Sequence, residues 1–185
     1  MKKLALATTY VIIIVSAFFI VYLFLSNNNK PNNTHSNNSV EPAIPSQSND
    51  FVLKDLAESN NVTVNFSDKP TVILFFTSWC PYCNEDAPKL VKLEKQYKSE
   101  VNVFGINVTY RDNIQDVKEY VQQHYIEYPT LLDESGDIYN KFGGSGFPSL
   151  YFFNAQGDIV DAIIGSTDIE TIENSFKYLL ENFNV

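Results

Sequence analysis

TVILFFTSWCPYC, residues 71–83, joins an apolar run to the only two cysteines of this 185-residue chain. Val72–Phe76 holds only β-branched, aliphatic and aromatic side chains, a composition typical of a strand buried on both faces. Cys80 and Cys83 follow, one helical turn apart, so their thiols can form and break one disulfide. The stretch therefore predicts a buried strand that leads into a helix with a redox-active pair at its start.

The two cysteines are predicted to play different parts. A cysteine at a helix N-terminus faces unpaired backbone N–H groups and the positive end of the helix dipole, which favour its thiolate and lower its pKa. Cys80 is therefore the predicted nucleophile, and Cys83, one turn inside the helix, is the predicted resolving thiol. Trp79, Pro81 and Tyr82 flank Cys80 and are expected to contact the substrate. No metal, flavin or nucleotide cofactor is expected, because the electrons of such an exchange stay on sulfur.

The N-terminal segment predicts a membrane anchor. Leu4–Leu25 has no charged residue, and as a helix it would span about 33 Å, enough to cross a bilayer. Lys2 and Lys3 precede it, which favours a cytoplasmic N-terminus and an extracytoplasmic remainder at a bacterial cytoplasmic membrane. We expect residues 1–25 to be an uncleaved anchor; a cleaved secretory signal is the alternative, and it exports the same domain.

The rest of the chain divides into a tether and one domain. Residues 26–50 are rich in Asn, Ser and Pro and have almost nothing apolar to bury, so a disordered tether is expected there. Residues 51–185 are enough for one core, and we expect a monomer. The formal net charge of −9 disfavours nucleic acid and anionic lipid as partners. Arg111 is the single arginine, and no basic patch is predicted.

Apolar segments alternate with turn residues in a βαβ pattern through this domain. Strands are expected at 51–53, 62–66, 72–76, 101–108, 130–132, 147–153 and 159–164, and helices at 81–97, 113–125, 137–142 and 168–183. Asn113 is a candidate N-cap. His124 falls in the last turn of the same helix, and we expect a helix-end residue there rather than a catalytic base.

With Trp79–Cys83 opening the first long helix and Gly146-Phe147-Pro148 preceding an apolar strand, the chain resembles the thioredoxin fold. Within that fold it is similar to the membrane-tethered TlpA/ResA-like thiol–disulfide oxidoreductases. The resemblance implies an α/β fold with a central mixed β-sheet flanked by helices, a leading β pair, and an insertion between Asn113 and Phe142. It also implies a cis peptide bond at Phe147–Pro148, with both residues forming a substrate-binding wall beside the cysteines.

Three positions depart from that family pattern. Leu74 stands six residues before the nucleophile, where thioredoxin usually has an acid. Asp86 stands three residues after Cys83, where ResA-like proteins have a glutamate; it is the predicted third catalytic residue, relaying a proton to or from Cys83. The alternative is that Asp86 is simply an acid stabilised by the helix dipole. Phe147 replaces the smaller residue that often precedes the proline.

These features predict dithiol–disulfide exchange with protein substrates. The resemblance favours a reductase of exported proteins, for example during cytochrome c maturation, supplied with electrons by a membrane partner. A disulfide-forming oxidase remains an alternative, because Pro81-Tyr82 between the cysteines resembles both glutaredoxin and oxidising DsbA-like motifs. Copper or zinc handling is a weaker alternative, since two cysteines fill only half of a tetrahedral site. A peptide-binding module without exchange chemistry is another, and a peroxidase is disfavoured because no activating residue set is identified.

Overall fold

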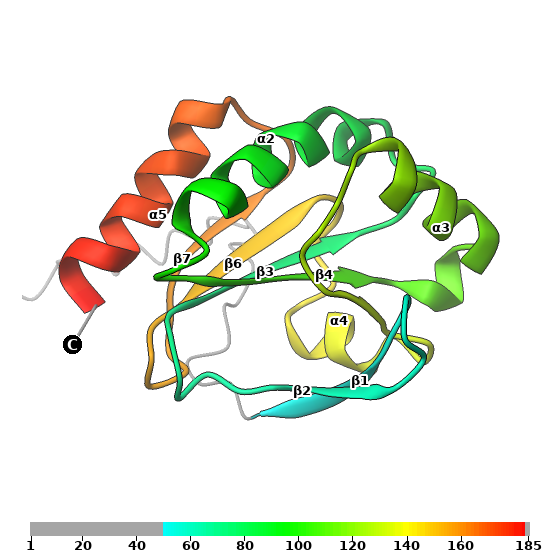
Figure 1. Cartoon of the computed structure of the whole chain (residues 1–185), viewed down its shortest axis with the longest axis horizontal. Coiled ribbons are helices and arrows are strands. Elements are labelled where there is room, and N and C mark those ends of the chain that lie inside the picture. The colour runs from blue at the N-terminus through cyan, green and yellow to red at the C-terminus, as the bar shows by residue number, and fades with distance from the viewer. Residues whose placement is uncertain (1–49, 184–185) are drawn as a thin grey trace, which may run out of the picture. The chain divides into compact units, whose positions relative to one another are not determined.

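The computed structural model describes residues 50–183, which form an α/β domain (Figure 1). The predicted anchor and residues 26–49 of the predicted tether lie outside these residues. None of the helices between residues 50 and 183 has the length and apolar character needed to cross a membrane.

A seven-stranded mixed sheet forms the centre of the domain, in the order β2-β1-β5-β4-β3-β6-β7. β3, β4 and β5 run parallel, whereas the other neighbouring pairs are antiparallel. The predicted leading β pair is present, and it extends the same sheet because β1 pairs with β5. The strands are β1 (Phe51–Asp55), β2 (Asn61–Val64), β3 (Thr71–Phe76), β4 (Asn102–Asn107), β5 (Thr130–Leu132), β6 (Ser149–Phe153) and β7 (Ile159–Ile164).

Helices cover both faces of this sheet (Figure 1). α2 (Pro81–Tyr97), α3 (Ile114–Gln123) and α5 (Ile169–Phe183) pack on one face, and the short α4 (Asp137–Lys141) packs on the other. A 3-10 turn, η1 (Thr109–Arg111), follows β4. Every residue of β3 is buried, which is the reason its sequence is an unbroken apolar run.

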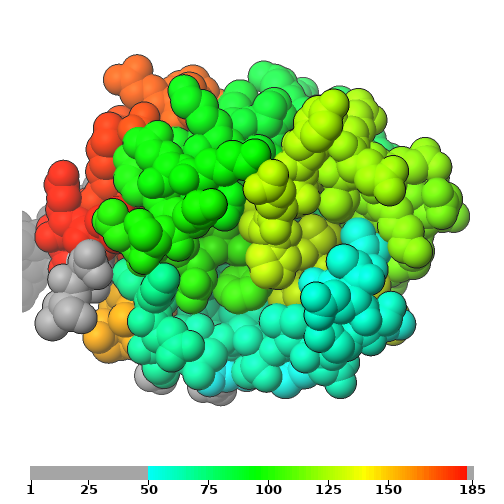
Figure 2. Space-filling model, viewed as in Figure 1, coloured from blue at the N-terminus to red at the C-terminus, as the bar shows by residue number. Residues whose placement is uncertain are grey.

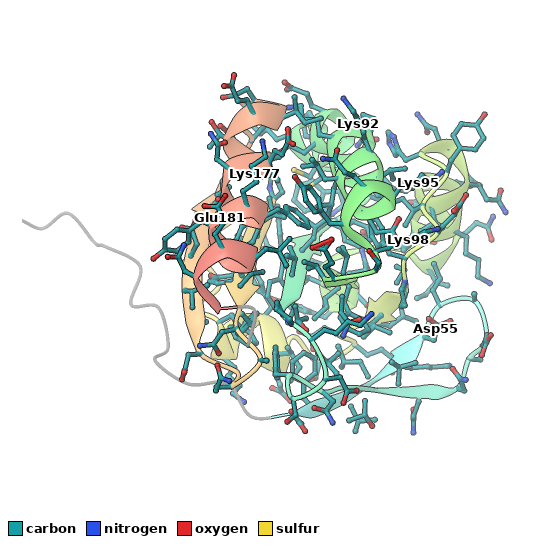
Figure 3. All side chains as sticks on the ribbon, turned by 60° about the vertical axis from the view of Figure 1, so that its left-hand side comes forward. Asp55, Lys92, Lys95, Lys98, Lys177 and Glu181 are labelled. Atoms are coloured by element: carbon teal, nitrogen blue, oxygen red, sulfur yellow. The ribbon has the colours of Figure 1, made fainter. Side chains whose placement is uncertain are left out.

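α2 has the two-sided character that the sequence predicts. Leu90 and Leu93 are buried against the sheet, while Lys92 and Lys95 of α2 and Lys98, its C-cap, point outward (Figure 3). In the space-filling view, α2 shares one face of the molecule with the segment around residues 120–130 and with the β1–β2 hairpin (Figure 2).

Some predicted element ends were wrong, and local chemistry explains two of them. β2 ends at Val64, because the Asn65 side chain accepts a hydrogen bond from the Ser67 backbone N–H and turns the chain. β6 begins at Ser149 rather than at residue 147, because Pro148 has no N–H to donate to a sheet. α3 ends at Gln123, two residues early.

Candidate active site

The two cysteines lie at the carboxyl end of β3, where α2 begins. Both are free thiols, and both are buried, with exposed fractions of 4% for Cys80 and 1% for Cys83. Cys80 is the N-cap of α2, and its Sγ accepts a hydrogen bond from the Cys83 backbone N–H at 3.4 Å. Pro81 occupies the first helical position, where a missing N–H is harmless. The helix start therefore directs an N–H group at the predicted nucleophile.

A cis peptide bond joins Phe147 to Pro148, as the resemblance implies. The Cys80 thiol donates to the Phe147 carbonyl oxygen at 3.7 Å. The structure thus brings the Gly146–Pro148 loop, 67 residues further along the chain, directly against the first cysteine.

Cys83 lies deeper than Cys80. Burial raises the pKa of the Cys83 thiol well above its usual value, and the neighbouring Cys80 and Asp86 act in the same direction. Leu74 is buried in the same apolar cluster, so β3 brings no carboxylate beneath the thiols. Cys83 therefore stays protonated unless another group accepts its proton.

Asp86 is the buried acid closest in sequence to that thiol, one helical turn after it. Its Oδ1 accepts from the Lys89 ammonium at 2.7 Å and from the Ser166 hydroxyl at 2.5 Å. Its Oδ2 is buried and has no hydrogen-bond partner. Burial lowers the pKa of Lys89, but the pairing with Asp86 outweighs this and raises it overall. Asp86 is thus held through one oxygen, and the other has no hydrogen-bond partner.

Aromatic side chains surround Cys80 on the surface. Trp79 and Tyr82 are 55% and 59% exposed, and Pro81 is exposed between them. Phe147 is half-buried; it stacks on Tyr139 at a centroid distance of 4.9 Å and meets the edge of Trp79 at 6.1 Å. The predicted substrate-contact residues therefore gather around one thiol.

A groove of about 360 Å³ runs beside this aromatic group. It lies between Tyr82 and the Gly146–Phe147 loop on one side and the end of β7 on the other. A larger hollow of about 600 Å³ lies between the β1–β2 hairpin and the end of α3, and no predicted site residue lines it.

Sequence reasoning missed the role of Asn84, whose side chain bonds to the backbone of residues 78–83, called here the cysteine turn. The Asn84 Nδ2 donates to the Ser78 carbonyl oxygen at 3.0 Å and to the Cys80 carbonyl oxygen at 2.9 Å. Its Oδ1 lies 2.9 Å from the His124 Nε2, and because that oxygen can only accept, the hydrogen is assigned to Nε2. His124 is the C-cap of α3, as expected for a helix-end residue, and burial lowers its pKa. The only sequence signal for this structural role of Asn84 is its position directly after Cys83.

Tyr120 supports the same turn from α3. Its hydroxyl donates to the Cys83 carbonyl oxygen at 2.9 Å, and its ring stacks on Phe76 at 4.9 Å and against His124 at 4.6 Å. Among residues 50–183, no three His, Cys, Asp or Glu side chains gather closely enough to hold a metal ion.

A free dithiol at the start of the helix after a central parallel strand, facing a cis-proline loop in a mixed sheet, defines the thioredoxin-like class of proteins. The chain belongs to the AhpC/TSA family, whose model matches residues 44–162.

Named relatives agree with this class. Sporulation thiol-disulfide oxidoreductase A from Bacillus subtilis is 24% identical over 135 residues, covering 72% of this chain and 79% of its own. Thiol-disulfide oxidoreductase ResA from Bacillus thuringiensis subsp. konkukian is 24% identical over 135 residues, covering 72% and 77%. The solved structure of a thiol:disulfide interchange protein from Chlorobium tepidum has a TM-score of 0.64 at 23% identity, covering 75% of this chain and 98% of its own. The predicted thioredoxin-like fold and the predicted enzyme class, a thiol–disulfide oxidoreductase, are confirmed.

Proposed function

We propose that this enzyme reduces disulfides in exported proteins through Cys80 and Cys83. The Cys80 thiolate attacks a substrate disulfide and forms a mixed disulfide, and the substrate's other sulfur leaves as a thiolate and takes up a proton. Cys83 then loses its proton to the free oxygen of Asp86 and attacks the Cys80 sulfur. The substrate leaves with two thiols, and the enzyme keeps one disulfide until a membrane partner reduces it.

The buried Cys83 is the observation that supports the reductive direction. A dithiol is a strong oxidant when its reduced form is stabilised, as in DsbA. Here burial and the nearby Asp86 disfavour the thiolate of Cys83, and no cation contacts its sulfur among the described residues. Cys83 therefore adds no thiolate stabilisation to the reduced pair, the feature that makes DsbA a strong oxidant.

Location and substrate are part of the same proposal. Residues 1–25 would anchor the enzyme, residues 26–50 would tether it, and the domain would work on the extracytoplasmic side of the membrane. Proteins exported with unwanted disulfides are its proposed substrates, with apocytochrome c as the example that the ResA-like resemblance implies. Protease treatment of intact cells tests the orientation: the domain should be degraded, and its protection would contradict export.

The equilibrium potential of the Cys80–Cys83 couple tests the direction. The protein is equilibrated in buffers of oxidised and reduced dithiothreitol, and the oxidised fraction is measured by thiol alkylation. We expect a value close to the roughly −270 mV of thioredoxin. A value close to the roughly −120 mV of DsbA would show an oxidase instead. Cys83→Ser, which cannot release Cys80 from a mixed disulfide, should trap the native substrates, and Cys80→Ser serves as the matched control.

A further inference from the structure

Arg111, the only arginine of the chain, lies beside the active site. It ends η1 and is exposed, and its guanidinium forms no ion pair with any side chain among residues 50–183. Its guanidinium carbon lies 5.2 Å from the centroid of the Phe147 ring, a cation–π distance. The chain carries 22 acidic residues, so this isolation of its arginine needs a reason.

The position of Arg111 is fixed from two sides. Its backbone carbonyl oxygen accepts a hydrogen bond from the Trp79 Nε1 at 2.8 Å, which ties η1 to the residue before Cys80. Its side chain lies over the ring of Phe147, and the carbonyl oxygen of Phe147 accepts a hydrogen bond from the Cys80 thiol. The guanidinium is therefore held at the rim of the aromatic surface that surrounds the nucleophile.

The neighbouring acid does not compete for this guanidinium. Both carboxylate oxygens of Asp112 are already used: Oδ2 accepts from the Ser78 backbone N–H at 2.6 Å and from the Asn107 Nδ2 at 2.8 Å. Oδ1 accepts from the Ser78 hydroxyl at 2.6 Å and from the Asn113 backbone N–H at 2.8 Å. The N–H donors of Arg111 thus remain available to a ligand from outside.

We propose that Arg111 is a specificity-determining residue that binds a carboxylate of the protein substrate, close in sequence to the cysteine that reacts with Cys80. This proposal rests on the proposed function and names one feature of its substrate. A guanidinium presents a planar fork of donors that matches a carboxylate, and arginine and aromatic side chains together dominate binding at protein interfaces. The enzyme has a negative net charge, so it repels proteins that are acidic overall. The substrate that we propose therefore carries a carboxylate near its reactive cysteine without being strongly acidic as a whole.

Short peptides with one cysteine test the proposal. The cysteine is carried as a mixed disulfide with 5-thio-2-nitrobenzoate, and a Glu, Gln or Lys is placed at one of the two positions on either side of it. The reduced enzyme attacks: Cys80 bonds to the peptide sulfur, the coloured thiolate leaves, and Cys83 then displaces the peptide thiol. The rate of colour release is measured for each peptide and divided by its rate with free dithiothreitol, which corrects for intrinsic reactivity.

We expect the Glu peptide to react about fivefold faster than the Gln peptide at one position at least, the effect of one exposed but well-oriented charge pair. Arg111→Gln should abolish this preference, Arg111→Glu should favour the Lys peptide, and Arg111→Lys should keep part of it. Added salt should weaken the preference. Equal normalised rates for Glu and Gln at every position, or a preference kept in Arg111→Gln, would overturn the proposal. So would an equal loss of rate with all peptides in Arg111→Gln, which would mean that Arg111 acts on Cys80 itself. Failure of every peptide to react would instead overturn the proposed function.

Discussion

Asn84→Asp is the sharpest test of the role of Asn84 in the cysteine turn, because it keeps the shape of the side chain and reverses its hydrogen bonding. The two donated bonds, to the Ser78 and Cys80 carbonyl oxygens at 3.0 and 2.9 Å, become contacts between acceptors. Each such bond contributes about 1 kcal/mol net, so the variant should lose about 2 kcal/mol of unfolding free energy at pH 8.

The same substitution should reverse the effect of pH on His124. In the native protein, burial lowers the pKa of His124 below 6.5, so its contribution to stability is lost as pH falls through the folded-state value. A carboxylate in place of the Asn84 amide would raise the pKa of His124 instead. In the variant, the stabilisation from protonated His124 is fully present below about pH 6.5, the ordinary histidine pKa. It is lost as pH rises through the raised pKa of His124 in the folded variant. With about 1.4 kcal/mol for each unit of pKa change, the deficit of the variant should shrink below about 1 kcal/mol by pH 5.5.

Urea unfolding between pH 5.5 and pH 8, followed through the fluorescence of the single tryptophan, measures this deficit. His124→Gln is the matched control, because its amide keeps a donor near the Nε2 position and does not titrate. In that background the Asn84→Asp deficit should be independent of pH. A deficit that stays constant with pH in the native background would refute the assigned Asn84–His124 bond, and no deficit at pH 8 would refute the two bonds that Asn84 donates to the Ser78 and Cys80 carbonyl oxygens.

Three further predictions concern the surrounding groups. Lys89→Met removes the cation from the nearly buried Asp86 and should cost about 3 kcal/mol in urea unfolding, and Asp86→Asn in the same chain should recover most of it; no recovery would contradict the ion pair. Tyr120→Phe removes one hydroxyl that donates to a buried carbonyl oxygen and should cost about 1.5 kcal/mol by the same method, whereas a neutral result would contradict that bond. Because burial raises the pKa of Cys83, iodoacetamide at pH 7 to 9 should label Cys80 alone in the folded protein, as mapped by mass spectrometry, and early labelling of Cys83 would contradict the assigned roles.

The parts of the site that the sequence predicted are those encoded by neighbouring residues. The apolar run of β3 and the cysteine pair at the start of α2 follow from strand composition and helix chemistry within 27 consecutive residues, 71–97. The bounds of α2, β5 and β7 agree with the prediction for the same reason. The cis bond at Phe147–Pro148 came from the resemblance to a family, since nothing local to that dipeptide requires it.

The parts that the sequence did not predict depend on contacts between distant segments. Asn84 meets His124 across 40 residues, and Asp86 meets Ser166 across 80. Each of these residues has an ordinary local explanation, such as a helix-end histidine or an acid in the first turns of a helix. The additional contacts form only because α3 and the end of β7 pack against α2. The spacing of apolar residues in the sequence carries no information on that packing.

These distant contacts give the cysteine turn two independent supports. On one side, Tyr120 of α3 donates to the Cys83 carbonyl oxygen, and His124 at the end of α3 contacts Asn84, which donates to the Ser78 and Cys80 carbonyl oxygens. On the other, the segment after β7 holds the next helical turn, where Asp86 bonds to Ser166 and Lys89 donates to the Thr167 carbonyl oxygen at 2.6 Å. Residues far from the cysteines in sequence, on α3 and after β7, therefore fix the backbone that carries Cys80 and Cys83.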